Sequence, residues 1–255
     1  MSKKLVPRAL ALFALCLALV SCGGGHSSGT ASTSGPAGPG GPTTGAQPTV
    51  FDLQGGGQLI VNNDGTVVFQ GTALSPGGAT ARFGGAQVFS GNGLVLERLG
   101  SSTGLSVADY GAWYAPNGPL TAMNFFAAGR GGPAVGSALP VSGSATYSGN
   151  YVAVLGSSPV SGPVTVTIRD FSAPTVGVAF SGPISTGGNG PLDRSTGTYT
   201  FAGQEIPRGG ALNGQGALYG NSAPETAGTF SGATSSQPVG PSTSQPFNGS
   251  FGAHR

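Results

Sequence analysis

The stretch VTVTIRDFSAPTVGVAF, residues 164–180, carries the clearest structural signal in the chain. Apolar residues alternate with polar or small ones in steps of two, on both sides of a break at residues 170–174. This alternation is typical of β-strands with one buried face, and the break has the composition of a turn. The stretch therefore predicts two antiparallel strands joined by a short connection.

The same two-residue period recurs from residue 49 to the C-terminus. Residues 59–61 and 67–69 flank an Asp64-Gly65 pair, which is typical of a β-hairpin. No window of ten residues in this region has a helical period, and Gly and Pro interrupt it throughout. The sequence predicts an all-β chain, with turn roles for Asp64, Asp170 and Asp193. Further strands are expected at residues 198–202, 211–219, 227–231 and 247–252.

Glycines lie inside several predicted strands, where β-branched residues would be more favourable. Glycine at such positions indicates a sharp bend or a close approach of two backbones, as at the corners of a barrel. A closed antiparallel barrel also leaves no exposed strand edge, which suits a chain with few charges to protect an edge. The glycines concerned are Gly214, Gly216, Gly228, Gly249 and Gly252.

The N-terminus has the form of a bacterial secretory leader. Three basic residues precede twelve apolar residues at positions 9–20, a run too short to span a bilayer as a helix. The sequence LVSC, residues 19–22, resembles the lipobox of bacterial lipoproteins. That resemblance implies signal peptidase cleavage between Ser21 and Cys22 and a lipid on the Cys22 sulfur. The alternative is an ordinary cleaved leader followed by a chance cysteine.

After the leader at residues 1–21, residues 22–48 consist almost entirely of Gly, Ser, Thr, Pro and Ala. Such a segment buries too little apolar surface to offset its chain entropy, so we expect a disordered tether. A lipid on Cys22 would then hold a folded body at a distance from a membrane. Gly23, in place of the aspartate that retains lipoproteins in the inner membrane, favours an outer-membrane location.

The charge balance excludes a nucleic-acid partner. The ten basic residues include Lys3, Lys4 and Arg8 of the leader, so residues 22–255 hold seven basic and eight acidic residues, a formal net charge of −1. Nucleic-acid binding needs clustered cations, which this region lacks. Cys16 lies in the leader and Cys22 would be lipidated, which leaves no thiol for a disulfide or a zinc site.

The side chains that catalysis requires are scarce. The folded region has one histidine, His254, and no nucleophile-elbow motif for a Ser-His-Asp triad. No spacing of His, Cys or carboxylate residues offers the ligands of a metal site. We therefore expect a protein without catalytic residues, metal or cofactor. A glycosidase with two paired carboxylates stays open as an alternative.

Four stretches carry a resemblance to a known family: DYGAW (109–113), LPVSGSATYSG (139–149), LYGNSAPETAGTF (218–230) and FNGSFGA (247–253). They resemble motifs of the transferrin-binding protein B family of bacterial surface lipoproteins. The first is similar to an aromatic strand of the family's handle subdomain, which precedes a β-barrel. The second is similar to the opening strand of that barrel, and the last two are similar to its closing strands.

The resemblance implies a small β-rich handle subdomain at residues 49–137, followed by an antiparallel eight-stranded β-barrel at residues 138–255. We expect the barrel to close by pairing of its last strand, 247–253, with its first, 144–155. Members of the family capture transferrin, haemoglobin, haem or factor H, and many reach the cell surface through an outer-membrane translocator. This chain has the length of a single lobe, whereas transferrin binders carry two.

An aromatic cluster in the handle has two interpretations. Tyr110, Trp113, Tyr114, Phe125 and Phe126 could form the core of the handle. They could instead form a ligand-binding face, because tryptophan and tyrosine are enriched in binding hot spots. Tyr110 is also a candidate haem ligand, although it has no partner histidine. On the second interpretation the ligand-binding residues are Trp113, Tyr114, Phe126 and, in the next glycine-rich loop, Arg130.

These features favour a non-enzymatic lipoprotein that is anchored by lipid in the outer membrane and captures a ligand from a host or the environment. The candidate ligands are a host protein and a haem-carrying molecule, in service of iron or haem supply, and a lipoprotein translocator is a candidate partner in export. The alternative is a structural or adhesin-like envelope lipoprotein without a small-molecule ligand, which the low charge and high glycine content equally permit.

Overall fold

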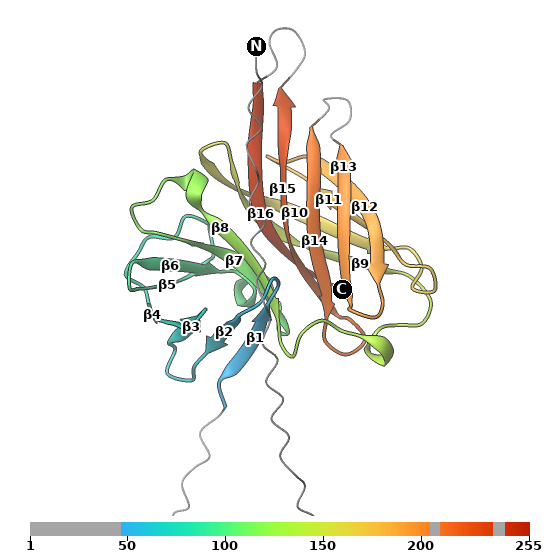
Figure 1. Cartoon of the computed structure of the whole chain (residues 1–255), viewed down its shortest axis with the longest axis horizontal. Coiled ribbons are helices and arrows are strands. Elements are labelled where there is room, and N and C mark those ends of the chain that lie inside the picture. Colours follow the sequence, from blue (N-terminus) through green and yellow to red (C-terminus); the bar gives the residue numbers. More distant parts are fainter. Residues whose placement is uncertain (1–46, 205–209, 237–242) are drawn as a thin grey trace, which may run out of the picture. The chain divides into compact units, whose positions relative to one another are not determined.

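The computed structural model describes residues 47–204, 210–236 and 243–255, and its regular structure is almost entirely β (Figure 1). The described residues also form single turns of 3-10 helix at Ser101–Thr103, Leu120–Ala122 and Gly136–Ala138. The first eight strands are β1 (Thr49–Leu53), β2 (Gln58–Val61), β3 (Val67–Phe69), β4 (Thr72–Pro76), β5 (Gln87–Gly91), β6 (Leu94–Arg98), β7 (Ala108–Tyr114) and β8 (Asn124–Gly129). The next eight are β9 (Ala145–Leu155), β10 (Ser158–Ile168), β11 (Thr175–Phe180), β12 (Thr186–Asp193), β13 (Thr198–Gln204), β14 (Ala211–Tyr219), β15 (Glu225–Ser236) and β16 (Thr243–His254).

Strands β9–β16 form a closed antiparallel barrel, here called the C-terminal barrel. It closes between β16 and β9, with a register that runs from Phe247 opposite Leu155 to His254 opposite Ser148. This is the closure that the sequence predicts. The all-β class and the eight-stranded barrel are confirmed.

The handle differs from the expected small β-rich subdomain in one respect. Strands β1–β8 form a second closed eight-stranded barrel, here called the handle barrel. Its closure is short, because β1 and β8 pair only at Asp52 opposite Gly129 and Leu53 opposite Ala128. A closure of two residue pairs leaves no recognisable pattern in the sequence.

The three aspartates predicted at turns share one local structure. In each, the carboxylate accepts the backbone N–H and the side-chain hydroxyl of the residue two positions later, which fixes the turn. For Asp64 and Thr66 the two distances are 2.9 and 2.6 Å. They are 2.8 and 2.6 Å both for Asp170 with Ser172 and for Asp193 with Ser195.

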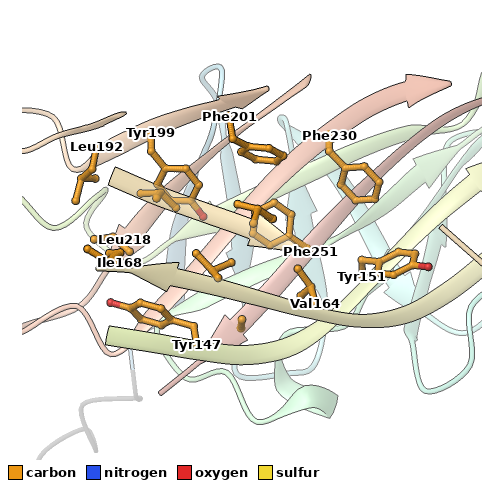
Figure 2. Packing of buried hydrophobic residues seen from close by; sticks show 14 of the residues in the cluster. Tyr147, Tyr151, Val164, Ile168, Leu192, Tyr199, Phe201, Leu218, Phe230 and Phe251 are labelled. Atoms are coloured by element: carbon orange, nitrogen blue, oxygen red, sulfur yellow. The ribbon is translucent and has the colours of Figure 1, made fainter. Parts of the chain in front are cut away.

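The interior of the C-terminal barrel explains four of the five predicted strand glycines, and the fifth, Gly252, lies against Tyr110 and Leu105 of the handle side. Aromatic rings fill it, and Figure 2 shows Tyr199, Phe201, Phe230 and Phe251 among them. Each ring lies across a glycine directly opposite on the neighbouring strand, and a Cβ on Gly214 would lie 2.1 Å from Cζ of Phe201. The prediction of close approach at these glycines is confirmed. The other pairs are Tyr199 with Gly216, Phe251 with Gly228 and Phe230 with Gly249.

Apolar side chains from both barrels meet in a shared cluster. On the handle side they come from alternate positions of β7, including Tyr110 and Tyr114, and on the other side from β9, β14 and β15. A buried hydrogen bond from Ser250 Oγ to the Gly111 carbonyl oxygen, 2.9 Å long, crosses the same contact. The outer face of β7 is therefore buried against the C-terminal barrel.

The predicted leader, the cleavage and lipidation site at Ser21 and Cys22, and the tether up to residue 46 lie outside the described residues. Within the described ranges, no helix has the length and apolar character needed to cross a membrane.

Candidate functional site

Strand β7 divides the predicted aromatic cluster between two faces. Successive side chains of a strand point to opposite sides, so Trp113 and Tyr114 cannot share a surface. Trp113 and Phe126 pack with the interior of the handle barrel, whereas Tyr114 belongs to the cluster between the barrels. Arg130 follows the end of β8. The structure does not bring the four predicted ligand-binding residues into one site.

Tyr114 forms part of a buried polar cluster around Glu97. Its hydroxyl donates to Glu97 Oε1 at 2.5 Å, and the Arg82 guanidinium lies 4.1 Å from the centre of its ring. The two Glu97 oxygens also accept the backbone N–H groups of Arg82 and Phe83, at 2.8 and 3.0 Å. Burial and the Glu97 carboxylate raise the pKa of Tyr114 well above its usual value. These contacts give Tyr114 a packing role.

Tyr110, the candidate haem ligand, is fully buried between the two barrels. Burial raises the pKa of its hydroxyl to about 12. Tyrosine binds haem iron through its oxygen, and both the burial and the raised pKa oppose the anionic form that binds best. The position of Tyr110 therefore favours packing over haem ligation.

Trp113 is partly exposed at one end of the handle barrel. The Phe69 ring lies between its ring and that of Phe126, with centroid distances of 6.0 and 5.5 Å. Phe126 is buried at 5% exposure, so only the tryptophan of this aromatic stack reaches the surface. The two predicted residues are thus neighbours through Phe69, and Trp113 alone can contact a partner.

A hollow of about 600 Å³ opens beside Trp113, here called the Trp113 hollow. Its rim consists of two hairpin turns, Gln70-Gly71 and Asn92-Gly93, in which all four residues have positive φ, from 48° to 80°. Each turn has only two residues, so each hairpin reverses sharply, and the Trp113 hollow lies between the two turns. Phe69, Thr72, Ala73 and Leu94 complete the lining.

Arg130 lies at the other end of the handle barrel. Its guanidinium is 5.4 Å from the centre of the Phe51 ring, and its Nη2 is 3.5 Å from Thr49 Oγ1. Strand β5 runs between the two ends, because Gln87 lines the pocket that contains Arg130 and Gly91 precedes the turn at the Trp113 hollow. Arg130 and Trp113 therefore belong to different surfaces.

Sequence reasoning missed the residues that shape the hollow. From the sequence, Phe69 is expected only as a strand residue, and neither turn is expected to have a functional role. Asn-Gly is among the strongest hairpin signals, so Asn92-Gly93 was available in the sequence. Over the described ranges, no three or more His, Cys, Asp or Glu side chains group closely enough to hold a metal ion.

Comparison with solved structures shows the fold of a transferrin binding protein B (TbpB) lobe, as the sequence motifs predict. Intact Ap-TbpB, with N and C lobes, matches with a TM-score of 0.52 at 15% identity, over 80% of this chain and 46% of that chain. Isotype 1 TbpB of serogroup B Neisseria meningitidis matches with 0.50 at 15% identity, over 82% and 43%. A double mutant of TbpB from Haemophilus parasuis Hp5 matches with 0.50 at 15% identity, over 82% and 44%.

The chain spans less than half the length of each of these structures. No protein-family model matches the chain, and no curated protein matches its sequence. The likeness therefore rests on the arrangement of handle and barrel.

Proposed function

We propose that this protein is a non-enzymatic capture protein, held in the outer membrane by a lipid on Cys22, that binds a host or environmental carrier of iron or haem. The Trp113 hollow is the contact site in this proposal, and Trp113 is the side chain that anchors the partner. An outer-membrane translocator would deliver the protein to the cell surface.

The observation that carries the proposal is the exposure of Trp113. It is the only tryptophan of the chain, and it lies partly exposed in a hollow although the aromatic rings beneath it are buried. Tryptophan dominates binding hot spots, because a large rigid ring gains contact area at small cost in side-chain entropy. A hollow of about 600 Å³ between two hairpin turns has room for a side chain of a partner protein.

The fold supports the same class of function. The solved structures with this arrangement of handle and barrel are named as transferrin binding proteins. Their name describes the binding activity of those proteins, and this chain matches less than half of each. We therefore propose capture as the function and leave the choice among carriers to the binding experiment.

The experiment blocks the hollow without altering the core. Ala73 is an exposed residue of β4 that lines the hollow, so Ala73→Arg should obstruct it and leave Phe69 and Trp113 packed. Ala179 is an exposed residue of β11 in the other barrel, so Ala179→Arg adds the same charge and volume elsewhere. The protein and both variants are immobilised and exposed to host serum and to haemoglobin, and retained proteins are identified by mass spectrometry.

We expect the unmodified protein and Ala179→Arg to retain the same partner, and Ala73→Arg to lose it with an unchanged melting temperature. Equal retention of the partner by both variants would show that the contact site lies outside the Trp113 hollow. Retention of nothing, together with no absorbance shift in a haem titration, would favour a structural or adhesin-like envelope protein.

A further inference from the structure

Two arginines converge on a pocket at the end of the handle barrel opposite the Trp113 hollow. The pocket has a volume of about 400 Å³ and is lined by Arg98, Arg130 and Asp109, with Phe51 at its side. Charged residues make up only 7% of the chain, and the described ranges contain six arginines in all. Two of these six in one pocket therefore call for a physical explanation.

Arg98 is held rigidly by a buried ion pair. Its Nη2 and Nε lie 2.5 and 2.7 Å from Asp109 Oδ2, and the two side chains are 6% and 1% exposed. The other carboxylate oxygen, Oδ1, accepts the backbone N–H groups of Gly100 and Tyr110, at 2.9 and 2.8 Å. Asp109 is thus engaged at both oxygens, and it fixes the orientation of the guanidinium.

The third nitrogen of Arg98 is left to the pocket. Nη1 has no acceptor among the described residues. The fully buried polar atoms that lack a partner are Gln54 Oε1 and Tyr110 Oη, so Nη1, which is not one of them, keeps contact with solvent. Since Arg98 lines the pocket, its Nη1 remains reachable from there. A guanidinium held on one edge presents its remaining N–H groups in a fixed direction, which is how arginine recognises planar oxyanions.

Arg130 supplies a second, movable cation at the same place. The Arg98 and Arg130 guanidinium carbons lie 5.7 and 5.4 Å from the centre of the Phe51 ring, so both lie close to the same aromatic side chain. Arg130 is exposed, and the only hydrogen bond of its side chain within the described ranges is the 3.5 Å contact to Thr49. Gln87 and Ser101 add neutral hydrogen-bonding groups to the lining.

The charge at the pocket favours an anion. Asp109 is the single acid in the lining, and its charge is offset by Arg98, which leaves the charge of Arg130 unbalanced. Two carboxylates outside the lining lie on neighbouring segments. Glu225 is 4% exposed and accepts the N–H groups of Ser106, Val107 and Ala108. Asp52 follows Phe51 on β1 and lies opposite Gly129, and it lines a different pocket, with Tyr219. Within the described ranges, neither forms an ion pair with Arg130.

We propose that this pocket binds the oxyanion group of a small molecule, a phosphate or a carboxylate, between the fixed Arg98 and the movable Arg130. Phe51 provides an apolar surface for the part of the molecule next to the charged group. The site is separate from the capture site of the proposed function, because β5 spans the distance between them.

The test is a calorimetric titration of the whole protein in chloride buffer with inorganic phosphate and, separately, with citrate. Arg130→Gln removes the movable cation from an exposed position and should not affect folding. Arg169→Gln is the matched control, because Arg169 is exposed on the other barrel and loses the same charge. Ala73→Arg, which obstructs the Trp113 hollow, serves as the second control.

We expect one anion per protein molecule, and about tenfold weaker binding for Arg130→Gln, the loss of one charge-assisted contact. Arg169→Gln and Ala73→Arg should bind as the unmodified protein does. Binding of phosphate alone, of citrate alone or of both supports the site and identifies the group it prefers. No binding up to about 10 mM of either anion, or equal weakening in Arg130→Gln and Arg169→Gln, would overturn it.

Discussion

The Glu225 carboxylate accepts the backbone N–H of Ala108 at 2.7 Å, which joins the first residue of β15 to the first residue of β7 in the other barrel. The same carboxylate accepts the N–H and hydroxyl of Ser106 and the N–H of Val107, so its two oxygens receive four hydrogen bonds. An ionised acceptor strengthens each of these bonds. Glu225 therefore fixes the handle barrel to the C-terminal barrel.

We expect Glu225→Gln to lower the free energy of unfolding by about 3 kcal/mol, because an amide offers one acceptor oxygen and turns its NH₂ group toward buried donors. Urea denaturation measures the change. Asp52→Asn is the control, since within the described ranges the Asp52 carboxylate accepts one long hydrogen bond, from Gln58 at 3.3 Å, and a change within about 0.5 kcal/mol is expected there. Equal losses in the two variants would argue against the role of Glu225.

The glycines opposite aromatic rings predict a strong effect of a single methyl group. In Gly214→Ala the new Cβ would lie 2.1 Å from Cζ of Phe201, so a ring packed in the barrel interior must move (Figure 2). Overpacking of this kind costs about 1–3 kcal/mol, and we expect a lower melting temperature to match. Gly84→Ala is the control, because its Cβ would meet nothing within 4 Å and its φ is not in the left-handed region. A Gly214→Ala protein as stable as Gly84→Ala would refute this packing.

The turns at Asp64, Asp170 and Asp193 should stabilise the folded state less as the pH falls. Hydrogen bonds from Thr66, Ser172 and Ser195 hold the pKa values of Asp64, Asp170 and Asp193 below their usual range. A pKa that is lower in the folded state stabilises the fold above the unfolded pKa, and this contribution is lost as pH falls through the folded value.

We therefore expect the triple variant Asp64→Asn, Asp170→Asn, Asp193→Asn to lose less stability than the unmodified protein between about pH 5 and pH 2. Asparagine keeps an acceptor for the turn but does not titrate. Unfolding free energies measured by denaturant titration at each pH give the comparison. Parallel pH profiles for the two proteins would show that these turns do not couple to folding.

The lipid anchor is tested at the N-terminus. We expect the mature protein to begin at Cys22 with a diacylglycerol on its sulfur, which mass spectrometry of the N-terminal peptide detects. Cys22→Ala should leave the membrane fraction, whereas Cys16→Ala, within the leader, should stay with it. An unmodified Cys22, or a Cys22→Ala protein that still sediments with membranes, would contradict the anchor.

Local patterns predicted most of the C-terminal barrel. The alternation of Val164, Val166 and Ile168 fixes which face of β10 is buried, and the turn aspartates act through neighbours two residues away. Strand glycines indicated close approach, although the partner ring of each depends on register and became clear only in the structure. The pairing of β16 with β9 was predicted because the family motifs match both of these strands.

The candidate site was predicted less well, for physical reasons. Trp113 and Tyr114 are adjacent in a strand, and adjacent side chains of a strand point to opposite faces. The prediction of one site that contains both residues was therefore wrong. The ion pair of Arg98 and Asp109 joins two strands in the interior of a barrel whose closure has no local signal. The pocket at Arg130 depends on that closure and could not be expected from sequence.

The most direct test of the capture site uses Trp113 as its own reporter, because no other tryptophan contributes to the emission. The measurement is acrylamide quenching of tryptophan fluorescence in the protein alone and with a saturating amount of the carrier retained in the binding experiment. We expect ready quenching in the free protein and clear protection in the complex, with protection absent in Ala73→Arg. A complex that forms while the quenching of Trp113 stays the same as in the free protein would contradict capture through the Trp113 hollow.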